Sequence, residues 1–559
     1  MSERTCWRYL VFMLLGAGLL LSFAPAAFAQ TASAIHQQAL KCSERQGILC
    51  AEQADIPGYE YVGHDEPSLL FYSETVGSGS TNIWRLHLPK DPPTLPRQDG
   101  HGGTWNFQLH PAFWFGMAMC DSQSFPNYTH VCRPDTDDNI FDSADPSSPR
   151  YIAKHPGSAF TELQFYPPAW LFGNSATQWT AALNIFSLSQ AAPSNIGQPN
   201  NSACGGAIEY DNFAYIQTDG VPTGPPSPLL ANGNTFTVNN NTLFMNPGDE
   251  LLVIERDTEE GLRITIRDLT TGQSGFVVAS AANGFAQILF DPNGTNCDPA
   301  THNLPYDFHP MYATSSEHTR VPWTAHSYNI AFSDEIGHFE YCDAVDAEGG
   351  NCLTTSKKDP PGLDDAFCFD AAFAAAFGLV PIGGCIDADA EFDGVPYRRA
   401  TWPGTFEDER LEVKLHAEPV MFSSPLFLGS EDHASNYDRV AFEADLPRIE
   451  TNTVPPCQRF ISNPGDPSPG SGCVNPPVGA AFYPIYTTRQ TALGCRWQLG
   501  GTHLPGTEQT FGGNSAEEYG PLLELAYPGA NNQPSLRYND VRRVLSSNPC
   551  PAAETFDGD

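Results

Sequence analysis

Between Asp249 and Phe290 the chain carries four short strand-like runs separated by turn sequences, which are DELLVIERD, GLRITIRDL, SGFVVAS and AQILF. In the run GLRITIRDL, Leu262, Ile264 and Ile266 alternate with charged and hydroxyl side chains. This alternation, with a period of two residues, is that of a β-strand with one buried face. Because the turn sequences TEEG and TTGQ are short, we expect neighbouring strands here to pair as an antiparallel meander.

Comparable strand-like runs lie on both sides of this meander. With 49 Pro and 48 Gly among 559 residues, long helices are disfavoured and turn-rich β structure is favoured. We therefore predict an all-β chain with a main β-sandwich over residues 61–342, preceded by an N-terminal segment over 30–60. An insert rich in Asp, Gly and Cys is expected over 343–410, followed by a smaller C-terminal β module over 411–559.

Residues 1–29 have the pattern of a cleavable secretory signal peptide. Arg4 and Arg8 precede an apolar run over 9–23, and the small-residue sequence Ala-Phe-Ala follows at 27–29. The apolar run is too short for a membrane anchor, and no other segment approaches the length of a membrane span. We expect the mature protein to be secreted and extracellular, without insertion into a membrane.

The cysteines support an oxidising destination. The chain has 15 cysteines, of which Cys6 lies in the signal peptide, so an even number, 14, is left for the mature protein. In an oxidising compartment this predicts complete disulfide pairing with no free thiol. The cysteines that are neighbours in sequence form the simplest local pairs, which are Cys42 with Cys50, Cys120 with Cys132, Cys342 with Cys352, Cys368 with Cys385 and Cys457 with Cys473.

The charge balance excludes two classes of partner. Lys and Arg number 28 against 65 Asp and Glu, which gives a formal net charge of −37. A field of this sign repels nucleic acid and anionic membrane surfaces. The absence of a G-x-S-x-G elbow and of a P-loop disfavours a common α/β serine hydrolase and a nucleotide enzyme.

Several segments carry a resemblance to known proteins. The order GHDEPSLLFYS, LHPAFWFGMAMCDSQSFP, LFMNPGDELLV and DLTTGQSGFVVASAANGF resembles an uncharacterised family of secreted bacterial and fungal proteins. More distantly, the meander resembles concanavalin-like sandwiches, the fold of lectins, of many endo-glycanases and of the glutamic peptidases. The resemblance implies a concanavalin-like antiparallel β-sandwich, and it supports the fold more than any function.

One predicted strand, AFTELQFY, places four side chains on a single face. Phe160, Glu162, Gln164 and Tyr166 alternate with residues of the opposite face. A carboxylate and an amide between aromatic rings suit a sugar-binding surface, with Glu162 and Gln164 as catalytic candidates and Phe160 and Tyr166 as substrate contacts. The resemblance to glutamic peptidases also implies a Glu–Gln pair that activates water. A non-catalytic binding face and a plain sheet face are the alternatives.

The segment from Phe308 to Cys342 is rich in histidine. Its runs TAHSYNIAF and GHFEYC predict two strands that bring His326 and His338 side by side as acid/base candidates, with His309 at a turn as a substrate contact. A zinc or copper site is one alternative, although no H-x-H or H-x-x-x-H spacing occurs in this segment. Core or loop histidines bonded to the backbone are the other alternative.

Two acidic loops offer alternating oxygen ligands for Ca²⁺. The candidate ligands are Asp135, Asp137 and Asp142 in CRPDTDDNIFD, and Asp387, Asp389 and Asp393 in DADAEFDG. Neither loop completes an EF-hand, because the twelfth position counted from Asp389 is Ala400. Calcium is thus the cofactor hypothesis, and a solvated acidic loop is its alternative.

Taken together, these patterns predict a secreted protein that acts on extracellular polysaccharide, as a glycan hydrolase or lyase. The alternatives are a non-catalytic glycan-binding protein and a glutamic-type acid peptidase.

Overall fold

The computed structural model describes a large part of the chain between residues 68 and 553. The described residues are 68–73, 78–93, 112–119, 159–168, 175–187, 201–204, 211–291, 293–310, 330–335, 339–341, 395–397, 417–428, 433–445, 460–461, 486–499, 525–528, 534–537, 540–545 and 547–553, together with residues 105, 106 and 123.

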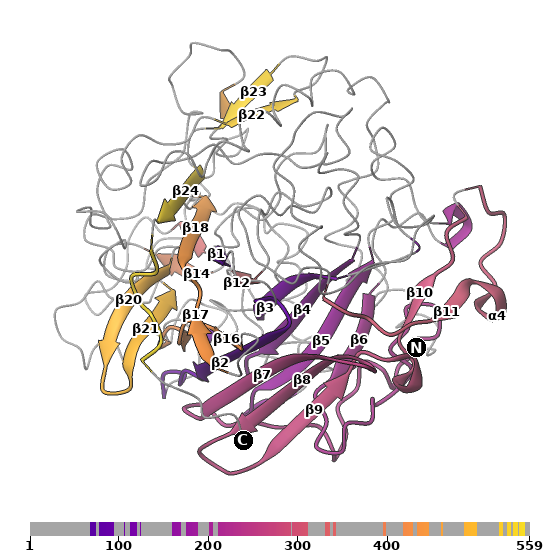
Figure 1. Ribbon diagram of the computed structural model, residues 1–559, viewed down its shortest axis with the longest axis horizontal. Coiled ribbons are helices and arrows are strands. Elements are labelled where there is room, and N and C mark those ends of the chain that lie inside the picture. The colour runs from indigo at the N-terminus through magenta and orange to yellow at the C-terminus, as the bar shows by residue number, and fades with distance from the viewer. Residues whose placement is uncertain are drawn as a thin grey trace.

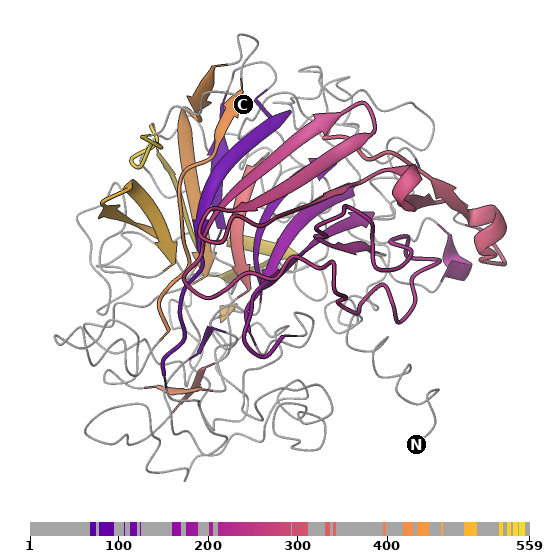
Figure 2. The same cartoon turned by 90° about the horizontal axis from the view of Figure 1, so that it is seen from below.

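Two large antiparallel sheets pack face to face (Figures 1 and 2). The eight-stranded sheet has the order β24 (Asp540–Leu545), β18 (Arg439–Asp445), β1 (Ser68–Tyr72), β12 (Ile330–Glu335), β3 (Ala112–Met119), β4 (Ala159–Tyr166), β5 (Thr180–Ser187) and β6 (Asp211–Tyr215). The nine-stranded sheet has the order β20 (Tyr486–Thr491), β21 (Gly494–Leu499), β15 (Met421–Phe422), β2 (Thr81–His87), β7 (Glu250–Thr258), β8 (Gly261–Asp268) and β9 (Ser274–Val278), and β2 also pairs with β16 (Leu426–Leu428), which pairs with β17 (Ala434–Asn436).

Aromatic side chains fill the space between the two sheets. The ring of Trp84 on β2 lies 4.8 Å from that of Phe332 on β12, and Phe332 stacks at 4.2 Å on Phe422 of β15. All three side chains are fully buried. Because large rings in offset and edge contacts dominate the energy of a core, this cluster holds the sheets together. The all-β sandwich predicted from sequence is confirmed.

The predicted meander is β7, β8 and β9, and turn chemistry explains where it reverses. The β7–β8 hairpin ends at Gly261, whose φ of 115° is one that residues with side chains rarely adopt. A Cβ added at this position would also lie 2.5 Å from the Ala279 carbonyl oxygen, so only glycine fits. In the β8–β9 turn, the Asp268 carboxylate accepts hydrogen bonds from the backbone N–H groups of Thr270 and Thr271 at 2.9 and 3.0 Å. These local features fix the register of the meander.

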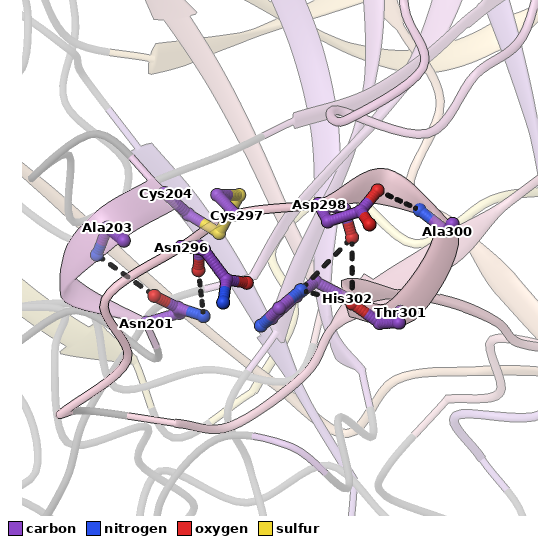
Figure 3. Close-up of a disulfide and its surroundings, with 9 residues drawn as sticks. All are labelled: Asn201, Ala203, Cys204, Asn296, Cys297, Asp298, Ala300, Thr301 and His302. Atoms are coloured by element: carbon purple, nitrogen blue, oxygen red, sulfur yellow. Dashed lines mark hydrogen bonds between the residues drawn. A yellow bond between two sulfur atoms is a disulfide. The ribbon is translucent and has the colours of Figure 1, made fainter.

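The fourth predicted run of this region leaves the large sheet. It forms β10 (Ala286–Ile288), which pairs with β11 (Asn303–Pro305) in a separate two-stranded sheet beside the short helix α4 (Pro299–His302). The disulfide Cys204–Cys297 ties this region to the 3-10 turn η7 (Ser202–Cys204), as Figure 3 shows. Nearby, Asp298 caps α4 by accepting from the N–H of Ala300 at 3.0 Å.

The C-terminal part of the chain completes both large sheets. β18 pairs with β1, and β15 pairs with β2. This differs from the expectation of a smaller module over 411–559 packed on the sandwich, because these strands supply hydrogen bonds and core side chains to the sandwich itself. Two small sheets remain, β13 (Phe339–Tyr341) with β14 (Val395–Tyr397), and β19 (Phe460–Ile461), β23 (Pro534–Arg537) and β22 (Leu525–Pro528).

The described cysteines are paired over long distances in sequence. Besides Cys204–Cys297, the structure contains Cys495–Cys550, with sequence separations of 93 and 55 residues. Disulfide formation is thus confirmed for these cysteines, while the five local pairs predicted from spacing lie outside the described residues, as does the segment 1–29. In the part of the chain that the structure describes, no helix has the length and apolar character needed to cross a membrane.

Candidate functional site

Strand β4 presents the predicted polar face on the outer side of the eight-stranded sheet. Leu163 and Phe165 point into the core and are fully buried, so Glu162, Gln164 and Tyr166 project from the opposite face. Phe160 occupies the same face by its register position, and its side chain lies outside the described residues. The alternation predicted for this strand is confirmed.

A chain of hydrogen bonds joins these side chains. The Nε2 amide of Gln164 donates to Oε2 of Glu162 at 2.6 Å, and the Tyr166 hydroxyl donates to Oε1 of the same Gln164. Asn184 on the neighbouring strand β5 donates from Nδ2 to the Tyr166 oxygen at 3.4 Å. Each polar group thereby restrains the next, and the Glu162 carboxylate is held in one orientation.

The side chains of this hydrogen-bonded series become more exposed toward Glu162. Asn184, Tyr166 and Gln164 are exposed by only 4%, 4% and 8%, whereas Glu162 is partly exposed. Directly across the sheet, Glu162 is paired with Gly116 on β3, which carries no side chain. The arrangement therefore consists of a supported carboxylate at the accessible end of a buried polar chain. Such a group can transfer a proton or accept a hydrogen bond from a ligand hydroxyl.

Two buried aromatic residues lie in register with the amide of this chain. Trp114 on β3 pairs directly with Gln164, which pairs in turn with Ala182 of β5, and Ala182 pairs with Tyr215 of β6. Trp114 and Tyr215 are exposed by 2% and 0%. They therefore flank the amide on the outer face without offering an open stacking surface.

His309 lies at another place, at one end of the sandwich. Its Nδ1 is 2.8 Å from Oδ1 of Asp257 at the end of β7, and its side chain is 23% exposed. The backbone holds it there, because Leu262 donates to the Phe308 carbonyl at 2.8 Å and Pro310 bridges to Met119. Asp257 fixes the orientation of the imidazole, so this is an Asp–His pair rather than an isolated turn histidine.

The described residues do not include the other candidates. His326 and His338 lie outside the described residues, and the strands next to them, β12 and β13, belong to different sheets rather than pairing with each other. The six candidate calcium ligands also lie outside the described residues. Among the residues that the structure does describe, no group of three His, Cys, Asp or Glu side chains could hold a metal ion.

Sequence reasoning missed a buried polar cluster between the sheets. Glu255 on β7 is 1% exposed, and neither of its carboxyl oxygens has a hydrogen-bond partner in the described structure. Burial raises the pKa of Glu255 well above its ordinary value of 4.5. Burial, and then the Glu255 charge, also raises the pKa of the Tyr437 phenol.

The signal for this cluster was present in the sequence. In ELLVIERDT the alternation that buries Leu251 and Val253 places Glu255 on the same inward face. A carboxyl at a core position of a strand is rare enough to be noticed.

Comparisons with known proteins do not identify a family for this chain. No protein-family profile and no curated protein matches the chain. Among solved structures, the enzymatically active domain of tailspike protein 2 from bacteriophage CBA120 is 10% identical and has a TM-score of 0.16. The match covers 51% of this chain and 22% of the tailspike chain. A likeness at this TM-score carries no argument about fold or activity, and the resemblance to secreted bacterial and fungal proteins stays a prediction.

Proposed function

We propose that this is a secreted protein that acts on extracellular polysaccharide at the outer face of β4, with Glu162 as the group that transfers a proton. The supporting observation is the hydrogen-bonded chain from Asn184 through Tyr166 and Gln164 to Glu162. It ends in a partly exposed carboxylate on a rigid strand, and catalytic groups built on strands are held more accurately than groups on loops.

Either a lyase or a hydrolase fits the carboxyl groups of this face. The strand register places Glu335 of β12 and Asp211 of β6 on the same face as Glu162, and most glycoside hydrolases use two carboxyl groups. Elimination from a uronic acid unit needs one base. The base takes the proton next to the sugar carboxylate, the resulting carbanion forms a carbon–carbon double bond, and the glycosidic C–O bond breaks with its electron pair on the leaving oxygen.

The test is the nearly isosteric substitution Glu162→Gln. We expect polysaccharide cleavage, measured as new chain ends and as unsaturated product, to fall by at least about 100-fold while polysaccharide binding is kept. The exposed Glu260 on the β7–β8 turn, changed to Gln in the same way, is the matched control for loss of one negative charge. Cleavage by Glu162→Gln at the rate of the unmodified protein would contradict the proposal.

A glutamic-type acid peptidase is the second candidate, because Gln164 contacts Glu162 directly at 2.6 Å. It predicts proteolysis with an acid optimum that both Glu162→Gln and Gln164→Ala abolish. Gln287 cannot take the place of Gln164 beside Glu162, because it lies on β10 in a different sheet and is 2% exposed. The peptidase function therefore depends on Gln164.

A non-catalytic glycan-binding protein is the remaining alternative from the sequence. In that case no preparation cleaves polysaccharide, and Tyr166→Ala weakens glycan binding more than Glu162→Gln does, because removal of the ring takes away packing as well as a hydrogen bond. Polysaccharide binding, polysaccharide cleavage and proteolysis, measured on the Glu162, Gln164 and Tyr166 variants, therefore separate the three functions.

A further inference from the structure

The outer face of the nine-stranded sheet collects arginines in a chain that has few of them. The chain has 28 Lys and Arg against 65 Asp and Glu. Six arginines nevertheless project from this one face, on five different strands. They are Arg85, Arg256, Arg263, Arg267, Arg489 and Arg496, and they are here called the arginine face.

The strand register places four of them in one row across the sheet. Arg489 pairs directly with Arg496, and Arg85 pairs with Leu252, which in turn pairs with Arg267. The two halves are joined by β15, which pairs with both β21 and β2. With strands about 4.8 Å apart, the row from β20 to β8 is roughly 24 Å long, which is the length of several sugar units.

The remaining two arginines lie directly opposite each other. Arg256 on β7 pairs with Arg263 on β8, and like charges opposite each other destabilise a sheet. Arg263 is held in place by the Phe276 ring, 4.1 Å from its guanidinium carbon, and by a hydrogen bond from Nε to Thr265 at 3.3 Å. Because Phe276 lies on β9, this contact holds the Arg263 guanidinium on the side of β8 away from Arg256.

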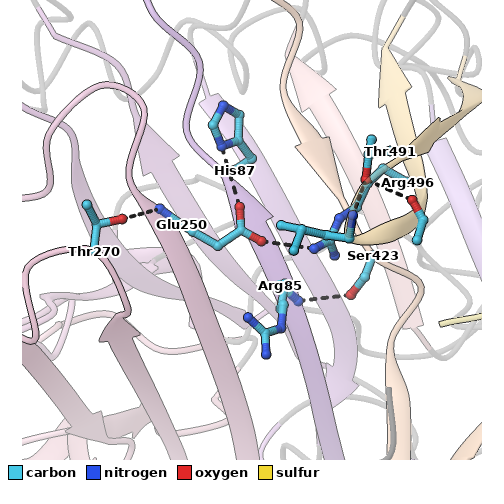
Figure 4. A network of polar contacts seen from close by, with 9 residues as sticks. Arg85, His87, Glu250, Thr270, Ser423, Thr491 and Arg496 are labelled. Carbon is cyan, nitrogen blue, oxygen red and sulfur yellow. Dashed lines mark hydrogen bonds and ion pairs between the residues drawn. The ribbon is translucent and has the colours of Figure 1, made fainter. Parts of the chain in front are cut away.

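Acidic side chains neutralise only part of this face. Glu250 accepts from Nη2 of Arg496 at 2.9 Å and lies 3.4 Å from Nδ1 of His87, and Figure 4 shows this network beside Arg85. Arg256, Arg267 and Arg489, in contrast, are exposed, and no carboxylate of the described residues pairs with them.

We propose that the arginine face binds a linear anionic polysaccharide that carries carboxylate or sulfate groups. Guanidinium groups bind both anions through paired N–H donors. In this row Arg489, Arg85 and Arg267 are at least partly exposed to such a ligand, whereas Arg496 is buried in its ion pair with Glu250. The net charge of −37 repels any polyanion at long range, most strongly the densely charged nucleic acids. At about 0.15 M salt the field of the net charge is screened beyond roughly 8 Å, so the nearby arginines of the row determine whether a polyanion binds.

This site is separate from Glu162, because the two lie on the outer faces of opposite sheets. The proposal therefore goes beyond the function assigned to β4. It places a binding surface for long chains on the side of the sandwich away from the proposed site of cleavage.

The test measures binding of polygalacturonate and dextran sulfate to the full mature protein, with neutral dextran as the uncharged probe. The single variants Arg267→Glu and Arg489→Glu and the double variant that combines them are compared with Arg439→Glu, which changes the charge by the same amount as each single variant and lies on β18 of the other sheet. We expect the double variant to weaken binding of at least one anionic polymer by at least about 10-fold at 0.15 M salt, and the control by less than about 2-fold. Circular dichroism and melting temperature should confirm that all the variants fold.

Unchanged binding by the folded double variant, or equally tight binding of neutral dextran, would overturn the proposal. Tighter binding of single-stranded DNA than of either acidic polysaccharide would overturn the choice of partner. Failure here is distinguishable from failure of the proposed function. If the double variant loses polymer binding but still cleaves short oligosaccharides fully, the arginine face binds polymer independently of cleavage at β4. If Glu162→Gln keeps full activity, the function proposed for β4 is wrong and the arginine face is unaffected.

Discussion

The buried carboxyl group of Glu255 makes the stability of this protein depend on pH in an unusual direction. Glu255 lies between the sheets, in register with Asn82 of β2 and Ile264 of β8, and has no hydrogen-bond partner among the described residues. Its pKa is raised well above 4.5 by burial. Well below pH 4.5 both the folded and the unfolded states keep the proton, so the group then favours neither state.

As the pH rises above 4.5, the unfolded state loses the proton first and gains the free energy of ionisation, while the folded state does not. The free energy of unfolding therefore falls, by about 1.4 kcal/mol for each pH unit, until the pH reaches the folded pKa of Glu255. The stability lost therefore grows steadily as the pH rises from 4.5 toward the folded pKa. Glu255→Gln removes the ionisation and keeps the shape.

We expect the stability of Glu255→Gln relative to the unmodified protein to increase as the pH rises from 4 to 6.5, by at most about 1.4 kcal/mol for each pH unit. Urea unfolding followed by tryptophan fluorescence across this range measures the difference. Asp249, whose pKa is raised by burial and to a lesser degree by Asp268, is present in both proteins, so its contribution cancels. A constant difference between pH 4 and pH 6.5, or a relative stability of the variant that falls over this range, would refute the reasoning.

Two further predictions concern covalent and metal stabilisation. Replacing Cys495 and Cys550 together by Ala opens a disulfide with a sequence separation of 55, and loop entropy predicts a loss of about 4 kcal/mol in the free energy of unfolding, measured by urea titration. A loss below about 1 kcal/mol would show that the bridge is not stabilising. The calcium hypothesis predicts that EDTA lowers the melting temperature and that added Ca²⁺ restores it, because a ligand bound only by the folded state stabilises that state. An unchanged melting temperature would reject it.

Local features of this chain could be predicted from the sequence because they depend on neighbours along the backbone. The alternation around Glu162 determined which side chains share a face, since successive residues of any strand point to opposite sides. The short turns around Gly261 determined the meander of β7 and β8. Cysteine counting predicted pairing, and removal of the five neighbouring pairs left Cys204, Cys297, Cys495 and Cys550, but the count could not say which of these four are bonded.

Only the tertiary structure decided which strands lie side by side. β1 pairs with β18, whose residues follow it by more than 350 positions, and the arginine face draws on β2, β7, β8, β20 and β21. Asn184 likewise joins Tyr166 only because β5 lies next to β4. A period of two shows which face of a strand is buried, but it does not show which other strands or sheet that face packs against. The partner is selected by the packing of Trp84, Phe332 and Phe422 in a shared core, a non-local property that no single segment of the sequence contains.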